Sequence, residues 1–255
     1  KVPFIVDNTV ATPYLLNPIE HGADIVIHSL TKYISGNGTS LGGAIIDAGN
    51  FDWSNGKFPE FTEPSAGYHG LKYYEVLGAS SFIAKVRIEG LRDLGASLSP
   101  FNAFQIIQGL ETLAIRIKKH SENALELAKW LQKQSEVAWV NYPGLTSSKY
   151  YDLAQHYLPE GQSGVVTFGL KSGFEGAKKV ADGTKLFALV ANIGDTKSLI
   201  IHPASTTHQQ LSEAQQISTG VSKDLIRLSV GLEDVEDLKA DLKAVFENIP
   251  VQNRV

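Results

Sequence analysis

Short apolar runs separated by polar loops dominate the first part of the chain. Residues 2–6, 23–29 and 42–47 are three such runs, and each has the length and composition of a buried strand. Residues 16–22 fit a short helix that ends at Gly22, because glycine readily adopts the left-handed conformation that closes a helix. A strand, a helix and a second strand in this order predict an α/β unit of the parallel type.

The pattern changes after residue 47. Residues 47–78 are rich in glycine, proline, aromatic and charged residues without a sustained period, which predicts a long loop or insertion. Residues 79–94 favour a helix, and Ser99-Pro100 indicates the cap and first turn of a longer helix that reaches about residue 119. A second helical segment is predicted at residues 121–134.

Strands and helices alternate again in the C-terminal part of the chain. The predicted strands are residues 137–142, 163–170, 198–202 and 225–230, and the predicted helices are residues 174–182, 211–218 and 234–248. This alternation predicts a second, smaller α/β domain. We therefore expect a domain boundary between residues 1–98 and 99–255, with the helix from Ser99 bridging the two.

Composition narrows the possible partners. The 255 residues carry a formal net charge of -4 with mixed signs, and this balance argues against a nucleic-acid partner. No apolar run reaches the roughly 18 residues that span a bilayer, so we expect a cytoplasmic protein without a membrane partner. The absence of cysteine excludes disulfides and thiolate metal sites, and no metal site is expected. The chain opens within a strand and without methionine, which suggests a piece of a longer protein.

Candidate chemistry gathers where two predicted strands end. Asp7 ends the first strand, and Ser29, Thr31 and Lys32 follow the second. The carboxyl ends of parallel strands meet at one edge of a sheet, which is where ligands bind in such folds. A carboxylate, two hydroxyls and an amine match pyridoxal phosphate, which needs an anion at its ring nitrogen, a lysine for its aldehyde and donors for its phosphate.

Other interpretations of these residues remain open at this point. Ser29-x-x-Lys32 also fits an acyl-serine enzyme of the β-lactamase class, and residues 121–123 and 171–173 loosely match that class's other motifs. Its nucleophile begins a buried helix, however, whereas Ser29 leaves a strand. Taken singly, Asp7 is typical of a turn or helix cap, and Lys32 is typical of a solvated surface. The glycines of residues 36–43 favour a tight turn beside the site.

Five longer blocks together carry a resemblance to a known family. They are VDNTVATPYLLNP, ADIVIHSLTKYISGNGTSLGG, SPFNAFQIIQGLETLAIR, HPASTTHQQLS and LIRLSVGLED, in that order along nearly the whole chain. The sequence resembles the Cys/Met-metabolism family of pyridoxal-phosphate enzymes of fold type I. This resemblance implies an α/β fold in which part of a cofactor-binding large domain, with a mainly parallel sheet, precedes a smaller C-terminal α/β domain.

The resemblance implies a role for each residue at the strand ends. Lys32 would hold pyridoxal 5'-phosphate as a Schiff base, and Asp7 would pair with its protonated ring nitrogen. Ser29 and Thr31 would bind the phosphate, and Thr9 would lie near the ring. Lys32 is thereby also the expected catalytic residue.

The resemblance also implies an amino-acid substrate. Arg227 would bind its α-carboxylate with help from Ser198. A guanidinium among apolar strand residues is costly unless it meets an anion, although a structural ion pair is the alternative. Residues 47–75 and 194–208 look most like the branch that converts O-acetyl-L-homoserine and sulfide or a thiol by γ-replacement. Cystathionine γ-synthase, cystathionine γ-lyase and methionine γ-lyase activities are the alternatives.

The sequence departs from the family pattern at its start. The N-terminal portion that contributes to the phosphate site and to the neighbouring subunit in relatives is missing. For the full-length protein the resemblance implies a homo-oligomer, either a dimer or a tetramer. An alternative from another class is a structural domain that holds no cofactor.

Overall fold

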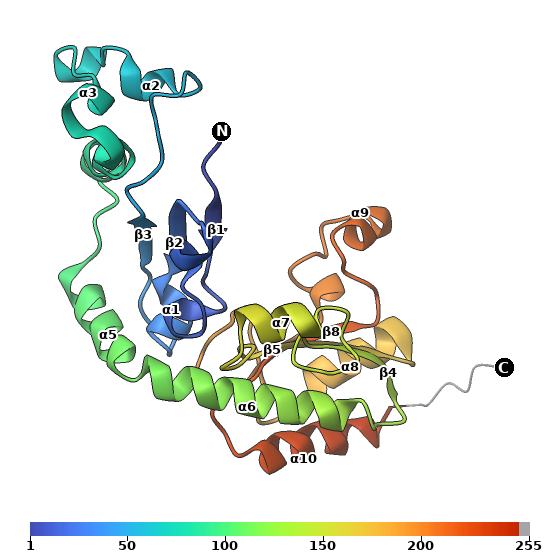
Figure 1. The fold of residues 1–255 in the computed structure, drawn as a ribbon. Helices are drawn as coiled ribbons and strands as arrows, with labels where there is room; N and C mark the ends of the chain where they lie inside the picture. The colour runs from blue at the N-terminus through green and yellow to red at the C-terminus, as the bar shows by residue number, and fades with distance from the viewer. Residues whose placement is uncertain (250–255) are drawn as a thin grey trace.

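The computed structural model describes residues 1–249, and its first unit is a small sheet (Figure 1). Strand β1 (Ile5–Asp7) pairs in parallel with β2 (Ile25–Ser29), as predicted, and β3 (Gly43–Asp47) pairs with β2 in the antiparallel sense. Helix α1 (Thr12–Leu15) and a 3₁₀ turn (Pro18–His21) connect the first two strands. The predicted short helix at residues 16–22 is this 3₁₀ turn.

The direction of β3 follows from its short connection. After β2 the chain forms one turn of π-helix (Leu30–Ile34) and then a loop that contains several glycines. A parallel neighbour needs a crossover over a face of the sheet, usually through a helix. This connection turns back at the sheet edge instead, so β3 runs antiparallel and Ser29 lies opposite Gly43.

Residues 48–98 form an arm that projects away from the sheet in Figure 1. The region expected to be a loop contains α2 (Pro59–Thr62) and α3 (Tyr73–Leu77), followed by α4 (Ser81–Lys85) and a π-helix (Val86–Asp93). These short helices pack around an aromatic cluster of their own. Its centre is Trp53, whose ring stacks on Phe82 with centroids 5.3 Å apart. The sequence predicted a long loop or insertion at residues 47–78, and these residues form an insertion that contains short helices. The short helices themselves were not predicted because the aromatic residues have no regular period.

Two consecutive helices connect the arm to the second domain. Helix α5 (Pro100–Glu111) begins where it was predicted, and α6 (Leu113–Leu131) follows after a break at Thr112. The break lies earlier than expected because α5 ends against the turn that follows β2. A Cβ atom at Gly109 would clash with the carbonyl oxygen of Ser35, so the two backbones are in direct contact.

The C-terminal domain contains a five-stranded sheet in the order β4-β5-β8-β7-β6. Its strands are β4 (Val137–Asn141), β5 (Val165–Leu170), β6 (Ala188–Leu189), β7 (Leu199–Ile201) and β8 (Leu225–Ser229). Its helices after α6 are α7 (Tyr151–Tyr157), α8 (Gly173–Gly183), α9 (Glu213–Ser218) and α10 (Val235–Phe246). Neighbouring strands are antiparallel except β6 and β7. All predicted strands and helices of this part are present, whereas α7 and β6 were not predicted.

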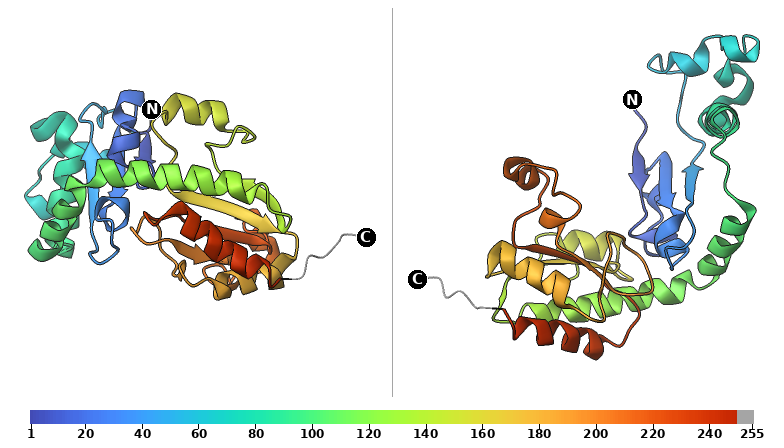
Figure 2. Two further views of the ribbon diagram at one scale, coloured as in Figure 1. Left: turned by 90° about the horizontal axis from the view of Figure 1, so that it is seen from below. Right: turned by 180° about the vertical axis from the view of Figure 1, so that it is seen from behind.

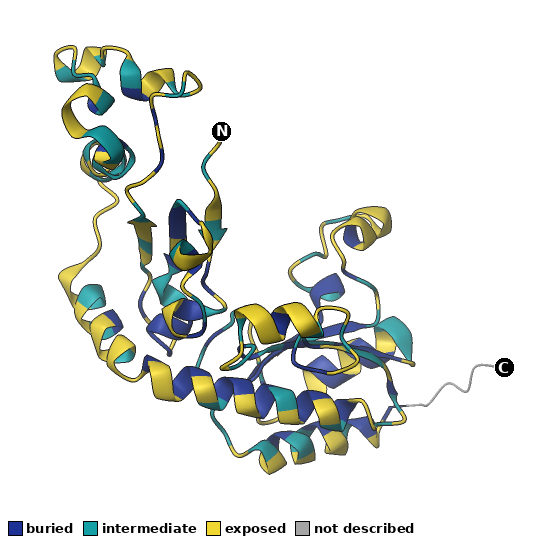
Figure 3. Ribbon diagram, in the orientation of Figure 1, coloured by how far each residue is buried: buried dark blue, intermediate teal, exposed yellow. Residues whose placement is uncertain are grey.

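Helices α6, α8 and α10 cover one face of this sheet (Figure 2). Their apolar residues meet those of β5 and β8 in the largest core, which appears as the dark blue interior of Figure 3. Side chains alternate between the faces of a strand, so Ile226 and Leu228 enter this core while Arg227 points to the opposite face.

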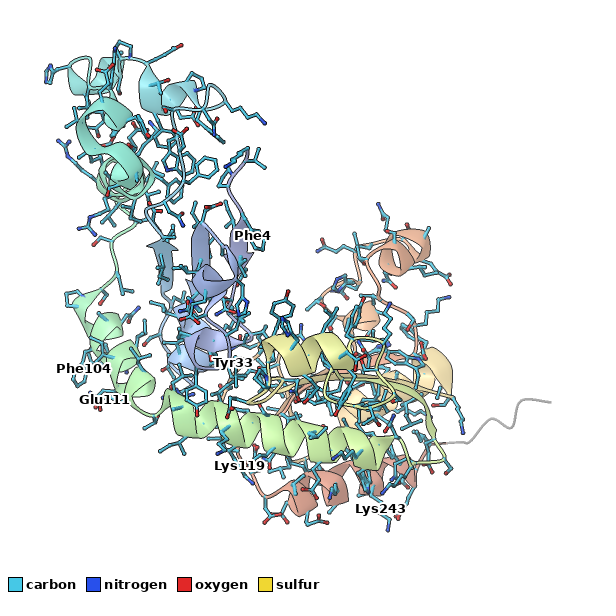
Figure 4. The ribbon with its side chains drawn as sticks, in the orientation of Figure 1. Phe4, Tyr33, Phe104, Glu111, Lys119 and Lys243 are labelled. Carbon is cyan, nitrogen blue, oxygen red and sulfur yellow. The ribbon has the colours of Figure 1, made fainter. Side chains whose placement is uncertain are left out.

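Tyr33, which is labelled in Figure 4, connects the first unit to the C-terminal domain. Its side chain is fully buried and its ring meets His120 of α6 edge-on at 5.1 Å. Helix α5 packs with this first unit through Ile106, while α6 contacts both parts. The boundary between residues 98 and 99 stays a prediction, and the helix that contacts both parts is α6.

The aromatic cluster predicts that the arm can lose its structure independently of the rest. Replacing Trp53, which is 3% exposed, by alanine should destabilise the arm by about 3–5 kcal/mol. We expect hydrogen–deuterium exchange to accelerate in residues 48–95 and to stay unchanged in β5 and β8. The matched control is Trp139→Ala, which removes a half-buried tryptophan from β4. Equal exchange of the arm in both variants would contradict a separate arm core.

Candidate active site

Thr9 joins the ends of the two parallel strands. Its hydroxyl oxygen accepts a hydrogen bond from the backbone N–H of Ser29 at 2.8 Å, and its own N–H donates to the carboxylate of Asp7 at 3.0 Å. Asp7 stands opposite Ile27 in the parallel register. Asp7 and Ser29 are thus brought to one edge of the sheet, as the strand pattern predicted, and Thr9 connects them there.

The carboxyl group of Asp7 is stabilised in its ionised form. The hydroxyl and the backbone N–H of Thr9 lower the pKa of Asp7 below its usual value, and the nearby His28 adds a smaller effect. Asp7 is exposed, and within residues 1–249 its only hydrogen-bond donor is Thr9. A negative charge with free acceptor positions is therefore available at this strand end.

Lys32 lies at a bend in the turn that follows β2. Its backbone angles, φ -87° and ψ -131°, interrupt the π-helix and direct its side chain away from the helical path. The ammonium group donates to the side-chain oxygen of Asn192 in the C-terminal domain. Burial lowers the pKa of Lys32, and the positive charge of Arg227 lowers it further. A lysine with a lowered pKa carries more free amine near neutral pH, which is the form that attacks an aldehyde.

Arg227 lies on the same side of the C-terminal sheet as Asn192. Its Nη2 donates to the backbone oxygen of Asn192 at 3.2 Å, and burial lowers its pKa. None of the ion pairs within residues 1–249 includes Arg227, so the alternative of a structural ion pair finds no partner. A half-buried cation with unused donors is a natural site for an anion such as a carboxylate.

The two predicted phosphate ligands differ in their surroundings. The hydroxyl of Thr31 accepts from the N–H of Gly42 at 3.1 Å and donates to its carbonyl at 3.4 Å, so it fastens the glycine-containing loop to the turn. The hydroxyl of Ser29 makes no hydrogen bond within the described part of the chain and is half-buried. Ser29 therefore has a free donor, and a phosphate role for both residues stays a prediction.

Ser198 is not brought to the site. Its side chain is fully buried, its hydroxyl donates to Glu233 at 2.8 Å and accepts from the N–H of Gly231 at 2.7 Å. The hydroxyl therefore holds the loop after β8, and this placement argues against direct contact with a substrate. Asn192 occupies the position beside Lys32 and Arg227 instead. Sequence reasoning missed Asn192 because an asparagine shortly before a glycine usually indicates only a turn.

The family of the chain is shown by comparison with known proteins. Residues 1–247 match the model of the Cys/Met metabolism PLP-dependent enzyme family, and the chain belongs to this family. The predicted family is thereby confirmed. Membership also removes support from the acyl-serine interpretation of Ser29.

Individual relatives share a printed activity. The chain is 56% identical to an O-acetyl-L-homoserine sulfhydrylase of Leptospira meyeri and 53% identical to O-acetyl-L-homoserine sulfhydrylase 1 of Thermus thermophilus. It is 48% identical to the homocysteine synthase of Schizosaccharomyces pombe. These alignments cover 97%, 95% and 96% of this chain but 58% of each relative. The chain thus spans less than two thirds of the length of the relatives it matches.

A solved structure confirms the predicted fold class. A crystal structure from Campylobacter jejuni subsp. jejuni, assigned as an O-acetylhomoserine (thiol)-lyase, superposes with a TM-score of 0.92 at 49% identity. It covers 96% of this chain, and this chain covers 59% of it. Its description names an N'-pyridoxyl-lysine-5'-monophosphate residue. The α/β fold of type I predicted from the sequence is therefore correct.

The residues of this structure fit pyridoxal phosphate. The exposed Asp7 carboxylate, the Lys32 amine of lowered pKa and the free Ser29 hydroxyl supply the three kinds of group that this cofactor needs.

No cluster of His, Cys, Asp and Glu within residues 1–249 could hold a metal ion. Among the same residues, no helix combines the length and the apolar character needed to cross a membrane.

The electrostatic coupling of Lys32 and Arg227 predicts a measurable change. Arg227→Gln removes a positive charge that disfavours protonation of Lys32, so the pKa of Lys32 should rise toward the ordinary value of 10.5. The pH dependence of amine modification at Lys32, followed by mass spectrometry, should move to higher pH. Lys223→Gln, which removes an exposed cation paired with Glu213, should leave it unmoved. An unchanged pH profile in Arg227→Gln would contradict the electrostatic effect of Arg227 on the pKa of Lys32.

Proposed function

We propose that this chain supplies the lysine site of a pyridoxal-phosphate enzyme that catalyses γ-replacement. The reaction converts O-acetyl-L-homoserine and sulfide into L-homocysteine and acetate. The observation that carries this proposal is the contact of Lys32 with Asn192 beside Arg227, which has no ion-pair partner in the described part of this family member. The names of relatives at 46–56% identity support the choice of substrate.

The chain's own residues would divide the work at the cofactor. Pyridoxal phosphate, when bound, supplies a sink for the electron pair left at a carbon next to the substrate amine. Asp7 would hold its negative charge toward the ring nitrogen, and the hydroxyls of Ser29 and Thr31 would bind the phosphate. Lys32 would bind the aldehyde through its amine and move protons at the substrate Cα and Cβ atoms.

Arg227 would hold the substrate in place, and Asn192 would orient Arg227 through its backbone oxygen. The free N–H groups of Arg227 would bind the α-carboxylate, which fixes the Cα proton near the amine of Lys32. During the reaction the bond between Cγ and the acetate oxygen breaks, and hydrosulfide forms a carbon–sulfur bond at the same carbon. A cytoplasmic location and assembly into a dimer or tetramer belong to the same proposal.

Replacement of Lys32 tests the covalent role. Borohydride reduction of the holoenzyme should place the pyridoxyl group on Lys32, and Lys32→Ala should carry none. Its kcat/KM should fall by about 10²–10⁴-fold or more, because proton transfer at Cα and Cβ is lost. Lys57→Ala, an exposed lysine of the arm, is the control and should behave like the parent. A pyridoxyl group found on another lysine would refute the assignment.

A substrate comparison tests the reaction. The holoenzyme should show its highest kcat/KM with O-acetyl-L-homoserine and sulfide when O-succinylhomoserine, cystathionine and methionine are assayed beside it. A preference for O-succinylhomoserine would instead favour cystathionine γ-synthase activity. Preferred cleavage of cystathionine or methionine would favour the corresponding lyase.

A further inference from the structure

Arg116 is a buried cation that binds backbone carbonyls only a few residues beyond Lys32. It lies in the first turn of α6 and is 8% exposed. Its Nη1 donates to the carbonyl of Tyr33 at 2.7 Å, and its Nη2 donates to the carbonyls of Ile34 at 3.0 Å and Gly109 at 2.6 Å. Its Nε donates to the hydroxyl of Thr112 at 3.0 Å.

This arrangement is unusual because the charge has no anionic partner. None of the ion pairs within residues 1–249 includes Arg116, although burial of an unpaired cation is costly. The positive end of its own helix is also unfavourable for a cation in the first turn. The compensation comes from carbonyl oxygens at the end of α5 and in the Lys32 turn, where the partial charge is negative.

The carbonyls that Arg116 binds belong to the turn that carries Lys32. The turn is short and ends at Ile34, so the carbonyls of Tyr33 and Ile34 have no following helical turn to bond with. Buried carbonyls need donors, and the guanidinium supplies them. A Cβ atom at Gly36 would lie 2.6 Å from Nη1 of Arg116, so the guanidinium sits directly against this backbone.

We propose that Arg116 is a positioning residue, which holds the turn so that the amine of Lys32 meets Asn192 and Arg227. The proposal rests on the proposed function of Lys32 as the residue that binds the cofactor. Arg116 would act through the backbone carbonyls of the turn. Its planar fork reaches the carbonyls of both Tyr33 and Ile34, which one ammonium group on a flexible stem cannot do with the same geometry.

Hydrogen exchange in the cofactor-free protein tests the hold on the turn. The N–H groups of Ser35 and Gly36 report it, because they donate to the carbonyls of Leu30 and Lys32. Arg116→Gln and Arg116→Lys should each raise their exchange rates at least about tenfold. Thr112→Val, which removes the hydrogen bond to Nε and the bond from the Thr112 hydroxyl to the carbonyl of Gly109 but leaves the guanidinium in place, should raise them less. This variant keeps the test valid if the other two variants do not fold.

A matched control separates positioning from general stability. Asn123 lies farther along α6, is 2% exposed and donates to the carbonyls of Gly231 and Glu233 in the C-terminal domain. Asn123→Ala therefore removes buried bonds from the same helix without touching the Lys32 turn. Exchange at Ser35 and Gly36 should match the parent in this variant.

The rate of cofactor capture tests the consequence for Lys32. When pyridoxal phosphate is added to the cofactor-free full-length protein, the visible absorbance change should be at least about tenfold slower in both Arg116 variants than in the parent. Asn123→Ala should capture the cofactor at the parental rate.

Three outcomes would overturn the proposal. Parental exchange at Ser35 and Gly36 in Arg116→Gln or Thr112→Val would show that the turn is held by other contacts. Parental behaviour of Arg116→Lys would show that charge alone suffices. Faster exchange at Ser35 and Gly36 with an unchanged rate of cofactor capture would show that the hydrogen bonds of Arg116 do not position the amine of Lys32. If the parent itself takes up no cofactor, the proposed function fails, while the exchange result still decides whether Arg116 holds the turn.

Discussion

The whole arrangement depends on how the turn after β2 inserts between the two parts of the chain. Tyr33 is buried against α6, and the N–H of Thr196 donates to the carbonyl of Gly36 at 2.7 Å. Gly194 lies so close that a Cβ atom there would stand 2.6 Å from the backbone nitrogen of Tyr33. Because Lys32 precedes Tyr33, these contacts place its amine beside the C-terminal domain. The amine of Lys32 and the guanidinium of Arg227 therefore meet Asn192 at the junction of the two parts.

The two arginines near Lys32 show how similar burial leads to different uses. Arg116 donates four hydrogen bonds to oxygens of the chain itself, so few of its five donors remain for a ligand. Within residues 1–249, Arg227 makes one such bond, to Asn192, and the rest of its fork has no partner there. The first arginine suits a structural hold, and the second suits recognition of a carboxylate. Hydrogen-bond saturation, rather than burial or charge, separates the two roles.

Local patterns were sufficient to predict most of the elements and part of the site. Asp7 and Lys32 were predicted because ligands bind at the carboxyl ends of parallel strands. Arg227 was predicted from the family resemblance, and its position among apolar strand residues agreed with that prediction. Asn192 could not be predicted in this way, because its contact is with Lys32, a residue 160 positions away in the sequence. The helix break at Thr112 was missed for a related reason. It is imposed by the close approach of Gly109 to Ser35, and the pattern of apolar residues along the sequence contains no sign of such a contact.

The lowered pKa of Lys32 follows from the same junction and connects the fold to the chemistry. Burial against the C-terminal domain and the charge of Arg227 both disfavour the ammonium form. Either effect would be lost if the turn moved outward into water, where a lysine stays protonated at neutral pH. Asn192 binds the side chains of both cations, through its amide oxygen and its backbone oxygen, and so holds them close despite their repulsion. A reactive amine at this position is thus a property of the packing between two domains, and it cannot be assigned to the Ser-x-Thr-Lys motif alone.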